Sequence, residues 1–229
     1  MRLYVVVEGQ TEEEFVKRTI GPHLTTLGIN VTAIIVTTKR DRKTGKKIGR
    51  GGGHWKHWLS DLRRLMSDQV GNNVRFTTLF DLYGLPDDFP NLEVHRGVAN
   101  TIQRAELLEK EMQATVDDYR LIPYLQRHEF EALVLAGLES LQLLLDAKDD
   151  LEGLEQLRAA LKQQCPEDVD DGVETAPSKR LAASIPGYVK ALYGPLVVEH
   201  LGLAKIRKTC PRFNDWLKKL ELLQTGSEQ

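Results

Sequence analysis

The sequence has few cysteines and no long apolar segment. Its two cysteines, Cys165 and Cys210, lie far apart and form no CxxC pair, which excludes a disulfide framework and a zinc knuckle. No apolar run approaches the ~18 residues that a membrane-spanning helix needs, so we predict no membrane association. The short N-terminal apolar run leads directly into three glutamates, so we expect no signal peptide and a cytoplasmic location.

An excess of basic charge and an ATP-binding loop are also missing. The formal net charge is -2, which excludes a uniformly basic nucleic-acid coat but leaves room for a local basic patch. No GxxxxGK[ST] motif occurs, so the chain is not expected to bind ATP itself. With 229 residues, of which 41% are hydrophobic and 28% charged, the composition is typical of a soluble chain with a full core.

The first fifteen residues predict a strand, a carboxylate, a turn and a helix. Residues 3–7 form an apolar run of β-branched and aromatic side chains, typical of a strand buried on both faces. Glu8 follows this strand, and Gly9 permits a tight turn. Thr11 and Glu14 have the spacing of a capping box, so a helix is expected to begin at Thr11. Open α/β sheets bind ligands at the carboxyl ends of parallel strands, where Glu8 would lie.

Strands and helices alternate over about the first 140 residues, which predicts an α/β fold with a parallel-cored sheet flanked by helices. Pro123 weakens the last expected strand and suggests a sheet edge or a bulge. The remainder reads as a helical C-terminal lobe or layer over residues 141–229. The expected strands are 3–7, 31–37, 74–80 and 120–126. The expected helices are 11–20, 54–70, 101–116, 132–138, 151–164, 178–193 and 199–223, with breaks at Gly21-Pro22, Gly194-Pro195 and Pro211, and an acidic loop at 167–174.

Three predicted strands end in acidic residues. Glu8 follows the first, Asp81 follows the strand 74–80, and Glu129 and Glu131 follow the strand 120–126. Converging carboxylates repel one another, and a divalent cation would balance them. Mg²⁺ prefers one or two carboxylates together with water and a substrate phosphate, and Mn²⁺ could replace it. Each acid also has an ordinary alternative role, as a turn former or as a helix-start residue.

Histidines, tryptophans and lysines near these strand ends leave further alternatives open. His128 lies beside Glu129 and could act as a general acid or bind a phosphate, although a lone histidine is more often structural. Trp55 and Trp58 have helical spacing and are expected in the core rather than stacked on bases. Lys190 falls in the helical region and is expected to be solvated, with contact to the substrate as the alternative.

A basic segment separates the second strand from the next helix. Seven of the twelve residues from 39 to 50 are Lys or Arg, and three glycines follow them. Such a cluster can bind a phosphate backbone through counterion release, so we predict contact with nucleic acid. The alternative is a solvated insertion. The predicted nucleic-acid-binding residues are Lys39, Arg40, Arg42, Lys43, Lys46, Lys47 and Arg50.

Three segments resemble a known family: EGQTEE at 8–13, FDLYGLP at 80–86 and QRHEFEAL at 126–133. They look like the Toprim domain, and more closely like uncharacterised bacterial Toprim-like proteins related to nucleases of the overcoming-lysogenization-defect (OLD) family. Many such proteins are thought to accompany ATPases in phage defence. The resemblance covers about residues 1–138 and implies a Toprim-like sheet and a metal-dependent nuclease acting on DNA or RNA.

The resemblance also implies residue roles. Glu8 matches the Toprim glutamate, a metal ligand or general base, and Asp81 matches the first acid of an Asp-x-Asp motif. Tyr83 replaces the second acid, which puts a two-metal site in doubt unless Asp87, Asp88, Glu129 or Glu131 supplies an oxygen. Glu12 matches a second acid of the nuclease branch or is a helix-start acid.

Together these observations lead to two hypotheses. In the first, the chain is a nuclease whose Mg²⁺ ligands are Glu8, Asp81, Glu129 and Glu131, with Glu8, Asp81, Glu129 and His128 in catalysis. In the second, it is a non-enzymatic Toprim-like subunit that docks an ATPase partner or senses nucleic acid. The substitution at Tyr83 favours the second hypothesis, and the acids at four positions favour the first.

Overall fold

The computed structural model describes residues 1–36, 53–162, 164–169 and 175–223. It contains a parallel sheet with the strand order β2-β1-β3-β4, and β5 also pairs with β3. The strands are β1 (Arg2–Val7), β2 (Asn30–Ile35), β3 (Val74–Asp81), β4 (Leu121–Ile122) and β5 (Leu125–Gln126). The predicted parallel α/β sheet is therefore confirmed. Pro123 divides the last expected strand into two short pieces at the sheet edge, as its missing N–H requires.

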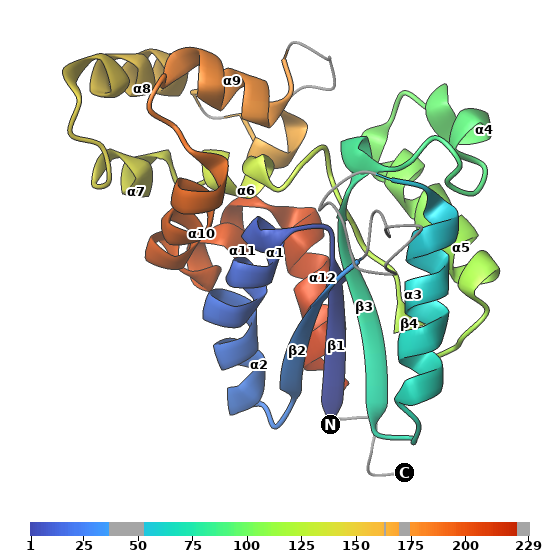
Figure 1. Ribbon diagram of the computed structural model, residues 1–229. Helices are drawn as coiled ribbons and strands as arrows, with labels where there is room; N and C mark the ends of the chain where they lie inside the picture. Colours follow the sequence, from blue (N-terminus) through green and yellow to red (C-terminus); the bar gives the residue numbers. More distant parts are fainter. Residues whose placement is uncertain (37–52, 163, 170–174, 224–229) are drawn as a thin grey trace, which may run out of the picture.

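Helices cover both faces of the sheet, and alternate residues of β1 point into two separate cores. Leu3, Val5 and Val7 belong to one buried cluster, while Val6 belongs to the other. In Figure 1, α3 and α5 lie on one side of the sheet, with α1 and α2 on the other. The helices near the sheet are α1 (Gln10–Phe15), a π-helix (Val16–Ile20), α2 (Gly21–Thr26), α3 (Trp55–Asp68), α4 (Leu92–Arg96) and α5 (Thr101–Val116).

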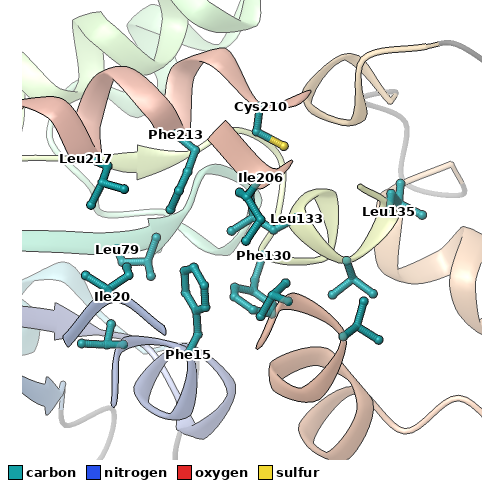
Figure 2. Packing of buried hydrophobic residues seen from close by; sticks show 14 of the residues in the cluster. Phe15, Ile20, Leu79, Phe130, Leu133, Leu135, Ile206, Cys210, Phe213 and Leu217 are labelled. Carbon is teal, nitrogen blue, oxygen red and sulfur yellow. The ribbon is translucent and has the colours of Figure 1, made fainter. Parts of the chain in front are cut away.

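The second half of the described chain is helical, as predicted. Its helices are α6 (Glu131–Leu135), α7 (Leu138–Gln142), α8 (Lys148–Leu161), α9 (Pro177–Ser184), α10 (Lys190–Leu201), α11 (Leu203–Thr209) and α12 (Pro211–Glu221), with 3₁₀ turns at Leu82–Gly84 and Pro166–Asp168. Phe213 of α12 packs with Phe15 of α1, whose ring also contacts Phe130 (Figure 2). Segments from both sides of residue 140 thus share one core, and a domain boundary there stays a prediction.

The capping box and the end point predicted for the first helix are both wrong. The helix does not begin with a capping box: Gly9 is the N-cap, no side chain caps it, and Thr11 is buried inside α1. The helical run also continues past Gly21-Pro22. The N–H of Gly21 bonds the carbonyl of Val16 in a π-helical turn, and Pro22 enters α2 where it needs no hydrogen-bond donor.

Gly194 and Pro195 do not break a helix, because both lie inside α10. A Cβ atom on Gly194 would come within 3.2 Å of the Thr11 side chain and 3.3 Å of Phe130, so the glycine permits close packing of α10 on α1. The expected helix 178–193 is instead divided earlier, at Ile185–Val189, between α9 and α10. Trp55 and Trp58 are buried in the core, as predicted.

Candidate active site

Glu8 and Asp81 lie side by side at the carboxyl edge of the sheet. Val7 of β1 pairs with Leu79 of β3, so the residues after Val7 run beside the end of β3. The backbone N–H of Asp81 donates a hydrogen bond to Oε1 of Glu8 at 2.7 Å. A Cβ atom on Gly84 would lie 2.8 Å from Oε2 of Glu8, so this glycine leaves room for the carboxylate. The sequence-based expectation that strand-end acids converge is confirmed for this pair.

Asp81 is held in turn by the segment that follows β5. Its Oδ1 accepts a hydrogen bond from the N–H of Phe130 at 2.8 Å. The side chain of Asp81 is 14% exposed, so Oδ2 retains little contact with water. The backbone around residue 130 therefore fixes the orientation of the Asp81 carboxyl group.

Burial and mutual repulsion disfavour the charged forms of this pair. Burial raises the pKa of Glu8 from 4.5 to about 8; the nearby Glu12 adds to this, while the Asp81 N–H and Lys190 act against it. Burial and the neighbouring Glu8 likewise hold the pKa of Asp81 well above its ordinary value. Glu12 is 5% exposed and acts on both carboxyl groups, so it belongs to the cluster and not to a solvated helix start.

Lys190 supplies a positive charge to this cluster while its side chain stays 44% exposed, so the prediction that it is solvated is confirmed. It is the first residue of α10, and its Nζ lies 2.9 Å from Oε2 of Glu131 and 3.9 Å from Oδ2 of Asp81. Burial acts to lower the pKa of Lys190, but Asp81 and Glu131 outweigh it and raise the value. A lysine distant in sequence has no local pattern that would have identified it.

Glu131 is completely buried and holds Lys190. Burial raises the pKa of Glu131, and Lys190 acts in the opposite direction. Its other oxygen, Oε1, has no hydrogen-bond partner among the described residues. Glu129 is directed elsewhere, because its Oε2 accepts a hydrogen bond from the N–H of Ser178 at 3.0 Å, at the start of α9.

Tyr83, at the position of the missing second acid, bonds to His128. The Tyr83 hydroxyl lies 3.0 Å from Nδ1 of His128, and the Tyr83 N–H donates to the His128 carbonyl at 3.0 Å. His128 is 2% exposed and has a left-handed backbone with φ of 63°. Asp88 does not supply the missing oxygen: it accepts a hydrogen bond from the N–H of Trp55 at 2.7 Å, at the start of α3.

The donors suit Mg²⁺ in chemistry, but they do not form a closed metal cage. Among residues 1–36, 53–162, 164–169 and 175–223, no group of three or more His, Cys, Asp or Glu side chains is arranged to hold a metal ion. Mg²⁺ needs only one or two carboxylates when water and phosphate complete its shell. Glu8 and Asp81 are such a pair, and burial together with neighbouring carboxylates raises the pKa of both groups.

Two other findings concern the wider chain. The basic residues predicted to bind nucleic acid, from Lys39 to Arg50, lie outside the described residues. Within the described part of the chain, no helix has the length and apolar character needed to cross a membrane.

The family model described as a domain of unknown function, DUF4276, matches residues 7–221. No curated protein matches the chain. Among solved structures, the C-terminal region of the Burkholderia pseudomallei OLD protein is similar at 18% identity and a TM-score of 0.47, over 98% of this chain and 97% of that one. The C-terminal region of the Xanthomonas campestris pv. campestris OLD protein is similar at 18% identity and a TM-score of 0.42, over 95% and 94%.

Proposed function

We propose that this chain, which belongs to the DUF4276 family of unknown function, is a metal-dependent nuclease that hydrolyses phosphodiester bonds in DNA or RNA. The observation that carries the proposal is the pairing of Glu8 with Asp81 at the carboxyl edge of the sheet. Two adjacent carboxyl groups with raised pKa values form a site that a divalent cation and a phosphate would complete.

In this proposal, Glu8 and Asp81 hold Mg²⁺ or Mn²⁺, which would supply positive charge to the phosphate oxygens and promote the activation of water. Burial raises the pKa of Glu8 to about 8 in the metal-free chain, and a bound divalent cation would favour the charged form that serves as a ligand. Lys190 extends from α10 toward the same carboxylates and would contact the scissile phosphate. Glu131 anchors Lys190, a role that replaces the predicted metal ligation.

The other predicted site residues take supporting roles in the proposal. His128 and Tyr83 bond to each other and fix the turn after Asp81. Glu129 caps the start of α9 and is not assigned to catalysis. The basic segment from Lys39 to Arg50 would bind the phosphate backbone, an assignment supported by its composition alone.

A second candidate is a non-enzymatic subunit that docks an ATPase partner or senses nucleic acid. Either role could serve in phage defence. It is favoured by Tyr83, whose phenol replaces a carboxylate, and by the lack of a three-acid metal group in the described chain. In this case the raised pKa values of Glu8 and Asp81 would leave the pair protonated and without a metal.

The deciding experiment is cleavage of labelled single- and double-stranded DNA and RNA with Mg²⁺ or Mn²⁺. We expect Glu8→Gln and Asp81→Asn each to lower the rate by at least ~10²-fold, because each removes a charged oxygen ligand. Asp215→Asn, an exposed change on α12 at a residue 69% exposed, is the matched control and should cleave normally. Cleavage that survives both site changes, or no cleavage by the pure wild type, would contradict the proposal and favour the docking role.

A further inference from the structure

A cavity of about 250 Å³ lies beside the candidate active site, between the turn after Asp81 and the helices α4 and α5. Its walls include four leucines, Leu82, Leu85, Leu92 and Leu108. All of them except Leu92 are buried. Tyr83 also lines it, two residues after Asp81. The cavity therefore shares the turn that directly follows Asp81.

Two arginines give this apolar cavity a positive rim. Arg96 of α4 and Arg104 of α5 both line it, against a single carboxylate, Asp87. Arg96 forms an exposed ion pair with Glu93 at 2.9 Å. Replacing Glu93 by another anion would cost little free energy, because exposed ion pairs are weak. The guanidinium of Arg104 forms no hydrogen bond or ion pair with the described residues, although the side chain is half-buried. A half-buried guanidinium that has no partner among the described residues favours an anionic ligand.

We propose that this cavity binds one unstacked nucleotide of a single-stranded nucleic acid, next to the phosphate that is cleaved. The leucines and the Tyr83 ring would contact the flat face of the base, because stacking and apolar contact tolerate any base. Arg104 and Arg96 would bind the flanking phosphates, and Asp87 offers an acceptor to a base amino group. The inference rests on the proposed function for the class of substrate.

The substrate form follows from the geometry of the cavity. A base can enter it only after leaving its helical stack, which costs a few kcal/mol in a paired duplex and little in a single strand. Single-stranded or frayed ends are therefore the preferred substrate. Duplex nucleic acid should bind more weakly, through the phosphate backbone only.

The test measures binding without cleavage, using Asp81→Asn protein in EDTA and fluorescence anisotropy of a labelled oligothymidine. We expect Arg104→Ala to weaken binding by about 5–10-fold, and Arg104→Lys to recover part of it. Arg64→Ala, which removes the same charge from a 69% exposed position on α3, is the matched control and should change affinity by less than about 2-fold. Equal effects of Arg104→Ala and Arg64→Ala would overturn the proposal.

Photocrosslinking of an oligonucleotide that contains 5-bromouracil gives an independent readout. A crosslink to Tyr83 or to the neighbouring wall at Leu82 and Leu85 supports the cavity, and crosslinks that all fall outside the cavity wall overturn it. Failure of the two proposals is distinguishable. Wild-type cleavage that Arg104→Ala leaves unchanged would refute the cavity alone. Arg104-dependent binding and a Tyr83 crosslink, in a protein that never cleaves, would refute the nuclease alone.

Discussion

Glu8 lies at the end of a buried strand beside an aspartate. Ionising it there costs free energy, and this cost should appear in the pH dependence of the stability of the protein. Its pKa is about 8 in the folded chain against 4.5 ordinarily, so the folded state holds a proton that the unfolded state has released between these values. This contribution to stability is fully present below pH 4.5 and is lost as pH rises through about 8.

We therefore expect the free energy of unfolding in EDTA to fall between about pH 5 and pH 8, by an amount on the order of a few kcal/mol. Urea denaturation at a series of pH values measures it. Glu8→Gln removes one titrating group and should make the profile less steep, although Asp81 and Glu131 still titrate. A divalent cation should raise the stability of the wild type at high pH. Identical profiles for the wild type and Glu8→Gln would contradict the assigned pKa.

Gly84 offers a way to move Glu8 without removing it. A Cβ atom at this position would lie 2.8 Å from Oε2 of Glu8, and that carboxylate oxygen is the mobile end of a flexible side chain. We expect Gly84→Ala to lower the cleavage rate by about 10-fold or more, because a displaced ligand loses its alignment, with a small change in stability. Gly97→Ala, where no atom lies within 4 Å of the added Cβ, is the control for rate and melting temperature.

The positive charge of Lys190 could stabilise the fold by pairing with Glu131, or it could act in cleavage. Changes at the two residues separate these roles. Lys190→Met should lower cleavage by about 10²-fold, because the only described cation that faces Asp81 is removed. It also leaves the buried Glu131 without its ion-pair partner, which should destabilise the fold.

The double change Lys190→Met with Glu131→Gln should restore the stability and leave the cleavage rate low. Chemical denaturation and nuclease assays on the two variants check this. A double variant that regains full activity would show that Lys190 serves only to neutralise Glu131.

At the scale of elements, Glu167 determines how α12 begins. This buried side chain accepts hydrogen bonds from the N–H groups of Arg212 and Phe213, at 2.9 and 3.0 Å. Its sequence neighbourhood predicted an acidic loop, but Glu167 is part of the core and caps a helix. Two otherwise unpaired backbone donors depend on it.

Glu167→Ala should therefore lower the free energy of unfolding by roughly 1–3 kcal/mol, because both donors are left buried without partners. Urea denaturation gives the value. Glu155→Ala, at a side chain 63% exposed, is a control that should change stability by less than about 0.5 kcal/mol. A loss at Glu167 no larger than at the control would contradict the capping role.

The elements that sequence predicted well are those that a local pattern specifies. Residues 3–7 and 74–80 are continuous apolar runs, and residues 101–116 carry a helical period, so each appears within a residue or two of its expected place. The errors arise where distant contacts override local preference. Gly194 lies inside a helix because α1 packs closely on it, and Thr11 is buried rather than placed at a cap.

The candidate site follows the same division. Glu8 and Asp81 were predictable because each follows an apolar strand, and parallel pairing then places them together. The place of Lys190 in the site could not be predicted, because a charged residue at a helix start has no distinguishing pattern in the sequence. Only the packing of α10 brings it to the carboxylates. The orientation of Glu129 toward α9 is likewise a tertiary effect.

At the scale of the whole molecule, the helical half completes the sheet that carries the acids. Trp216 of α12 stacks on Tyr124, with ring centroids 4.5 Å apart, and its Nε1 donates to the Thr77 hydroxyl at 2.9 Å. Arg212 of the same helix forms an ion pair with Glu109 of α5. One face of the sheet is thus covered by residues that come last in the chain.

The position of Lys190 has a consequence for synthesis of the protein. A ribosome has delivered both Glu8 and Asp81 long before it delivers the lysine that faces them, and α12 follows later still. In the proposed nuclease, a nascent or truncated chain would carry the carboxylates without the cation and without the helix that covers their sheet. Cutting activity would therefore require synthesis to pass α10 and α12, however early the two carboxylates are made.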